Sequence, residues 1–97
     1  MAQQAALAAA LGVTPRAITS LVDALVSHGL VTREPHPRDR RATLVTLTKR
    51  GEAVAHSFRV GHRELVRRLF QDVPADQLQA FDAVLHHVLD RLGPGQG

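Results

Sequence analysis

The hydrophobic positions near the N-terminus follow the spacing of a helix. In the segment QQAALAAALGV, four apolar residues can share one stripe: Ala5, Leu7, Ala8 and Leu11. The segment is rich in alanine, which favours helices, and Gly12 suits the position just after a helix. We therefore predict a first helix that ends near Leu11.

A second helical pattern follows almost at once. Thr14 suits the N-cap and Pro15 suits the first helical position, where a missing N–H group breaks no helical hydrogen bond. The apolar residues then lie at i, i+3, i+4 and i+7: Ile18, Leu21, Val22 and Leu25. Gly29 marks the end of this pattern. Two helices joined by a turn of about three residues have the proportions of a helix-turn-helix.

The pattern changes after Gly29. The segments LVTRE and ATLVTLT are rich in Val, Thr and Leu with partial alternation, which is typical of strands. The stretch from Pro35 to Arg41 between them reads as a hairpin loop. Two strands and a loop in this position predict a β-wing.

The remaining chain returns to helical spacing. Residues 48–70 read as one helix, weakened at Gly51 and Gly61, with one apolar face made of Val54, Phe58, Leu65 and Leu69. The segment VPADQLQAFDAVLHHVLDRLG reads as a second helix, whose inward residues are Leu78, Phe81, Leu85, Val88 and Leu92. The predicted class is mainly α with a small antiparallel β-hairpin (α+β), in one compact domain.

The charge of the chain is concentrated in the wing segment. The chain carries a net +3, but residues 33–50 alone sum to +4. Arg38, Arg40 and Arg41 stand on one loop, where they repel one another unless an anionic partner neutralises them. A local excess of this kind is typical of a nucleic-acid contact, although a solvated charge run is the alternative.

Composition narrows the class of partner and the type of protein. The chain has no Cys, which excludes disulfides and thiolate metal sites, and no long apolar run or signal-peptide pattern. We expect a cytoplasmic protein without membrane contact. With three Phe and no Tyr or Trp, it lacks the stacking platforms that bind single strands. Double-stranded DNA is therefore the predicted partner.

The outward face of the second helix is the candidate DNA-reading surface. Opposite the apolar stripe lie Arg16, Ser20, Asp23 and Ser27, with Ala17 and Thr19 on the flanks. The first residues of such a helix contact base edges in the major groove, so Arg16 could bind a guanine or a phosphate. An ordinary solvated helix face is the alternative. Asp23 fits DNA poorly, and we expect it to orient a neighbouring basic side chain instead.

The wing loop supplies a second contact. A loop that carries Arg40 and Arg41 suits the narrow minor groove, where the negative potential favours arginine. Asp39 would repel DNA, but it could order a nearby guanidinium through a charge-assisted pair.

No pattern indicates a metal, a cofactor or a catalytic site. The chain has six His, but no two of them are spaced i, i+4 on a helix, and it has neither a Gly-rich phosphate loop nor a nucleophile with a base. We predict that the protein is not an enzyme. Arg59, Arg63 and Arg67 form a basic stripe at i, i+4 and i+8, which we expect to meet Asp82 and Asp90 across a dimer.

The segment LAAALGVTPRAITSLVDALVSHGLVTREPHPRDRRATLVTLTKRG resembles the signature region of the MarR family, the winged-helix transcription regulators of bacteria and archaea. The resemblance covers residues 7–51 densely and 52–92 in pattern only. It implies a repressor that binds a pseudo-palindromic operator as a homodimer and can respond to a small effector, whose binding residues no pattern assigns. Together with the patterns above, it gives the predicted DNA-binding residues: Thr14, Pro15, Arg16, Ala17, Thr19, Ser20, Arg38, Asp39, Arg40 and Arg41.

The resemblance also divides the chain. Residues 1–50 would form the winged helix-turn-helix, 51–93 two dimerisation helices, and 94–97 a flexible tail. Members of the family begin with two further helices, so we expect exposed apolar surface and a rearranged dimer interface. The alternative is a truncated interaction module that pairs with a full-length relative and titrates it away from DNA.

Overall fold

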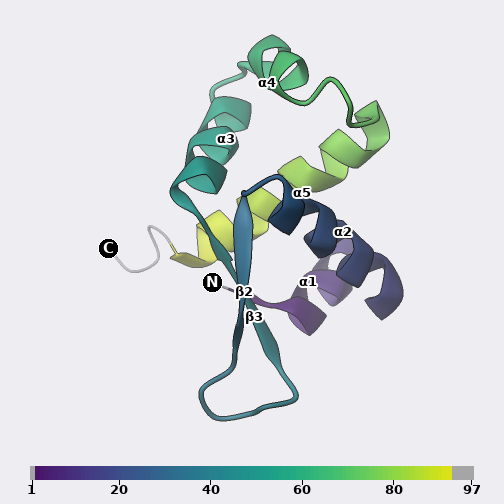
Figure 1. Ribbon diagram of the computed structural model, residues 1–97, viewed down its shortest axis with the longest axis vertical. Coiled ribbons are helices and arrows are strands. Elements are labelled where there is room, and N and C mark those ends of the chain that lie inside the picture. The colour runs from purple at the N-terminus through teal and green to yellow at the C-terminus, as the bar shows by residue number, and fades with distance from the viewer. Residues whose placement is uncertain (1, 93–97) are drawn as a thin grey trace.

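The computed structural model describes residues 2–92 of the chain, and the side chains of residues 2–90. It has five helices and a small sheet (Figure 1). In chain order the elements are β1 (Ala2–Gln3), α1 (Gln4–Leu11), α2 (Pro15–Ser27), β2 (Val31–Pro35), β3 (Thr43–Leu47), α3 (Lys49–Arg59), α4 (Arg63–Leu69) and α5 (Ala75–Leu92). The predicted class, mainly α with a small antiparallel sheet, is confirmed. The predicted tail at 94–97 lies outside the described residues.

The helix-turn-helix forms as the pattern predicts. Helix α1 ends at Leu11, and α2 begins at Pro15 behind Thr14, whose hydroxyl oxygen accepts a hydrogen bond of 3.0 Å from the Ala17 N–H group. Within α2, the buried residues are Ile18, Val22 and Leu25. This N-cap and this stripe fix where α2 starts and which face it turns to the core.

The wing is an antiparallel pair of β2 and β3, in which Val31 faces Leu47 and Pro35 faces Thr43. The loop between them projects away from the helices (Figure 1). The third strand, β1, pairs with the other edge of β3 and was not predicted. A strand of two residues is too short to show a periodic pattern in the sequence. Only its pairing with β3 makes this segment a strand.

The prediction of one helix over residues 48–70 is wrong. The chain forms α3 and α4 as separate helices, and Gly61 lies between them with φ +84°, a conformation that residues with a side chain rarely adopt. The break rotates the second half, so that Val66 and Phe70 are buried while Leu65 and Leu69 are exposed.

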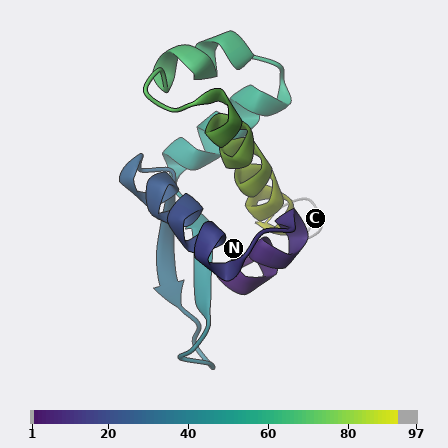
Figure 2. The same cartoon turned by 90° about the vertical axis from the view of Figure 1, so that its right-hand side faces the viewer.

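A single core joins the helix-turn-helix to the C-terminal helices. Helix α5 runs behind α2 and the sheet and packs against both (Figures 1 and 2). At the end of α2, the ring of His28 lies edge-on to two buried phenylalanines, 5.3 Å from Phe70 and 5.7 Å from Phe81 between centroids. Helix α2, which by its position is the recognition helix of the helix-turn-helix, is therefore anchored at its C-terminal end to the C-terminal half of the chain.

The start of α3 holds the turn that follows α2. Thr48 Oγ1 donates to the Gly29 carbonyl at 2.7 Å and accepts from the Gly51 N–H group at 2.9 Å. Arg50 Nε donates to the His28 carbonyl at 3.2 Å. The two backbones approach so closely that a Cβ atom on Gly51 would lie 2.0 Å from the Leu30 carbonyl oxygen. This contact joins the wing, the recognition helix and α3.

Among residues 2–92, no single helix has the length and apolar character needed to cross a membrane. Helices α1 and α2 meet that criterion only as a joined pair, and they are bent by 112°.

Candidate nucleic-acid interface

The N-terminal turns of α2 present a small, exposed surface. Arg16, Ala17 and Ser20 are exposed, as the stripe predicts, and they point away from the buried Ile18 and Val22. Within the described part of the chain, Arg16 has no carboxylate partner. Its guanidinium is thus free to bind an anion or a base edge.

Two of the predicted contact residues already use their hydroxyl groups within the chain. Thr14 caps α2. Thr19 is exposed, but its hydroxyl donates to the Pro15 carbonyl at 2.9 Å and accepts from Gln4 Nε2 at 3.2 Å. Thr19 therefore has little hydrogen-bonding capacity left for a base, which makes Arg16 and Ser20 the better candidates on this helix.

The wing loop is ordered by its own side chains. Asp39 Oδ1 accepts from the Arg41 N–H group at 3.0 Å, and His36 Nδ1 accepts from the Arg38 N–H group at 3.0 Å. The same Asp39 oxygen lies 3.6 Å from Arg41 Nε, so Arg41 is the nearby guanidinium with which Asp39 pairs. The Arg41 side chain remains 95% exposed. Asp39 therefore orders the turn and restrains Arg41 without removing it from solvent.

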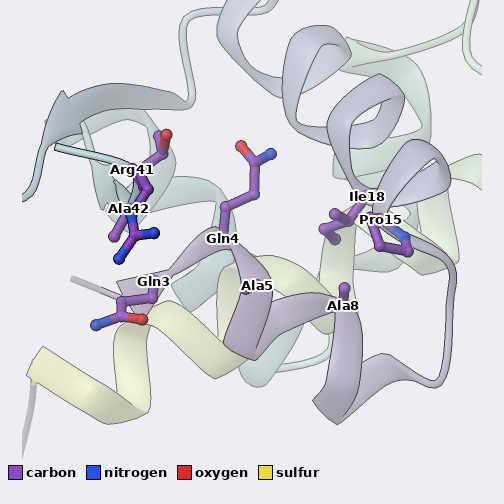
Figure 3. Close-up of a pocket in the computed structure, with 9 residues that line it drawn as sticks. Gln3, Gln4, Ala5, Ala8, Pro15, Ile18, Arg41 and Ala42 are labelled. Carbon is purple, nitrogen blue, oxygen red and sulfur yellow. The ribbon is translucent and has the colours of Figure 1, made fainter. Parts of the chain in front are cut away.

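The wing and the recognition helix meet around one cavity of about 210 Å³. Arg41 extends from the wing toward Gln3, while Pro15 and Ile18 close the opposite side (Figure 3). The lining residues are Gln3, Gln4, Ala5, Ala8, Pro15, Ile18, Arg41, Ala42 and Thr43. The fold thus brings the start of α2 and the cationic end of the wing to one side of the molecule.

A polar network centred on Arg33 lies behind this surface, and the sequence analysis did not predict it. Arg33 on β2 binds Asp23 on α2 at 2.5 Å between Nη1 and Oδ1. Its Nη2 donates to the Thr19 carbonyl at 3.0 Å, and its Nε donates to Gln4 Oε1 at 3.1 Å. The interpretation that Asp23 orients a basic side chain is confirmed. The sequence pattern could not show which basic side chain pairs with Asp23, because Asp23 and Arg33 lie on different elements.

The basic stripe on the C-terminal helices does not form as predicted. Arg59 lies on α3 and pairs with Asp90 of α5 within the same chain, at 2.9 Å, rather than across a dimer. Arg67 lies on α4, beyond the break, and its Nη1 is 3.4 Å from the Glu64 carboxylate. Within residues 2–92, no three His, Asp or Glu side chains gather to hold a metal ion.

A helix-turn-helix followed by an antiparallel wing defines the winged helix-turn-helix class. The MarR family model matches residues 1–43. The chain is 34% identical over 80 residues to the multiple antibiotic resistance protein MarR of Escherichia coli, a match that covers 81% of this chain and 56% of that protein. It is 30% identical over 86 residues to the HTH-type transcriptional repressor YetL of Bacillus subtilis, covering 89% of this chain and 52% of YetL.

Solved structures agree with these matches. A crystal structure of mutant MarR from E. coli in complex with operator DNA is similar to this chain, with a TM-score of 0.56 and 35% identity. The similarity covers 90% of this chain and 63% of that one. In sequence and in fold the chain matches the MarR family of winged helix-turn-helix proteins. It spans about half the length of the curated relatives that it matches.

Proposed function

We propose that the chain is the DNA-binding part of a transcriptional repressor, which binds a pseudo-palindromic operator as a homodimer. One observation carries the proposal: the exposed start of α2 and the restrained, solvent-exposed Arg41 lie around the same cavity. The E. coli relative whose structure holds operator DNA supports the class of partner.

The two parts of this surface would bind different grooves. The start of α2, with Pro15, Arg16, Ala17 and Ser20, is narrow enough for the major groove, and Thr14 and Thr19 would support it from within the chain. The wing residues Arg38, Arg40 and Arg41 would contact phosphates and the minor groove. Asp39 would act through Arg41. Simultaneous contact with both grooves would give the affinity.

The dimer sets the geometry of the operator. In this proposal residues 1–50 bind DNA and residues 51–93 supply the dimer contacts. Two identical recognition helices need two half-sites, related by a two-fold axis and about one DNA turn apart, roughly 10 base pairs. A small effector that changed this separation would release both half-sites together. Such a regulator acts where the chromosome is, in the cytoplasm.

A selection experiment tests the proposal. The purified chain is incubated with a pool of random duplexes at low salt, bound duplexes are amplified over several rounds, and the enriched sequence is confirmed by mobility shift. We expect an inverted repeat with half-sites about one turn apart. No enrichment and no shift would refute DNA binding. A module that only titrates a longer relative would give the same negative result when tested by itself. Mixed with that relative, it would abolish the mobility shift that the relative produces.

Arg41→Ala is expected to weaken binding to the selected duplex by about 1–3 kcal/mol, because a guanidinium in the minor groove neutralises phosphate charge. The slope of log affinity against log salt should fall by about one. Fluorescence anisotropy over a salt series measures both. Arg68→Ala is the matched control, once size-exclusion chromatography shows that it dimerises like wild type: it removes the same charge from α4, which lies at the opposite end of the molecule from the wing (Figure 1). An equal loss in both variants would contradict the role of the wing.

Arg16→Ala is expected to relax sequence preference more than it lowers affinity. A bidentate contact to a base contributes about 1–3 kcal/mol of discrimination, whereas a phosphate contact contributes none. Competition between the selected duplex and duplexes with single base changes in each half-site measures this discrimination. If Arg16→Ala weakened every duplex by the same factor, Arg16 would bind phosphate and not a base.

A further inference from the structure

Arg33 differs from the other arginines of the wing segment. Its side chain is 30% exposed, compared with 95% for Arg41. Each of its three nitrogen atoms donates to an acceptor within the chain. Its guanidinium is therefore committed to the fold, and it cannot bind phosphate without giving up these contacts.

The acceptors lie on two elements besides the strand that carries Arg33. Thr19 and Asp23 are one turn apart on α2, and Gln4 lies at the start of α1. Gln4 closes the network, because its Nε2 donates to the Thr19 hydroxyl at 3.2 Å. A planar guanidinium that binds two points on one helix and a third point on another restricts both rotation and tilt of that helix.

The strand that carries Arg33, β2, leads directly to the wing loop. Arg33 pairs with Val45 of β3, and β2 ends at Pro35, just before the loop that carries Arg38 and Arg41. We propose that Arg33 is a positioning residue that sets the angle between the recognition helix and the wing, so that both grooves are contacted at once. This inference rests on the proposed function.

The network is suited to alignment more than to stability. The Asp23 side chain is 61% exposed, and an exposed ion pair contributes little to the free energy of unfolding. The same pair also neutralises the only acidic residue on α2, which would otherwise face the duplex. If the charge of Arg33 matters, Arg33→Lys should keep DNA binding. If the geometry of its guanidinium matters, Arg33→Lys should lose it.

A double-mutant cycle tests the inference. Dissociation constants for the selected duplex are measured by anisotropy for wild type, Arg33→Gln, Arg41→Ala and the double variant. Arg33→Gln alone should weaken binding about tenfold, as a lost charged network does. Arg41→Ala should weaken wild type about tenfold but the Arg33→Gln protein less than about twofold, because a misaligned wing has less contact to lose. If the loss of affinity in the double variant were the product of the losses in the two single variants, the inference would be overturned.

A further variant separates alignment from charge. Arg33→Lys keeps the charge but loses the planar fork, and it should bind like Arg33→Gln; binding like wild type would overturn the inference.

Thermal unfolding of each variant shows whether it is folded at the assay temperature. If Arg33→Gln is unfolded, Asp23→Asn replaces it in the cycle, since it removes one contact and leaves Arg33 in place. The effect of Arg41→Ala should again shrink, and an unchanged effect would overturn the inference. A wild-type chain that enriches no duplex refutes the proposed function itself, whereas DNA binding with independent Arg33 and Arg41 refutes only the positioning role.

Discussion

Gly51→Ala is expected to lower the free energy of unfolding by about 3 kcal/mol or more, because the added methyl group has no space. Its Cβ would lie 2.0 Å from the Leu30 carbonyl oxygen and 3.0 Å from the Leu30 carbonyl carbon. Both atoms belong to backbone, so no side chain can rotate away. The usual effect of this substitution within a helix is the opposite, a gain of about 1 kcal/mol. Urea denaturation followed by circular dichroism measures the change.

Glu52→Ala is the control for this experiment. It lies next to Gly51 in the first turn of α3 and is exposed, so its loss should change stability by less than about 1 kcal/mol. If Gly51→Ala were as stable as Glu52→Ala, α3 would not approach the turn after α2 as closely as the structure shows. Partial separation of this contact would also displace Thr48 and Arg50 from the carbonyls that they bind.

Phe81→Ala is expected to cost about 3–5 kcal/mol, the range for removing a buried aromatic side chain. Phe81 is 1% exposed and lies on α5, where its ring contacts His28 at the end of the recognition helix. Its removal leaves a cavity between the two halves of the chain. The unfolding midpoint should therefore fall, and helical signal from both halves should be lost in one transition.

Leu69→Ala is the matched control for Phe81→Ala. Leu69 is also a large apolar residue of the C-terminal half, but it is 51% exposed, so its loss should change stability by less than about 1 kcal/mol. Two separate transitions in Phe81→Ala, or a cost no larger than that of Leu69→Ala, would contradict a single core. The ring contact of Phe81 with His28 would then not hold the recognition helix.

Local chemistry was sufficient to predict helix α2 and the face that it buries. Thr14 and Pro15 define its start, and the stripe of Ile18, Val22 and Leu25 defines its buried face, so the exposed positions of Arg16 and Ser20 follow. These signals are strong because capping and helical period involve residues close in sequence. The turn in the wing is local in the same sense, since Asp39 binds the Arg41 backbone two residues away.

The error over residues 48–70 is also local in origin: a glycine inside a helical pattern can be tolerated, but Gly61 takes φ +84° and the His62 N–H group donates to the Ser57 carbonyl across the end of α3. The omissions have the opposite property, because they join residues far apart in sequence. Strand β1 exists because β3 has a free edge. The hydrogen bond from Gln4 Nε2 to the Thr19 hydroxyl, 15 residues away, was likewise not predicted.

The sequence alone thus determined the helix-turn-helix, the wing and the cationic loop, because each depends on contacts within a few residues. The tertiary structure decided how these parts are aligned. The three bonds of Arg33 and the approach of Gly51 to Leu30 join residues far apart along the chain. No periodicity specifies such pairs, since their geometry exists only after the elements have packed.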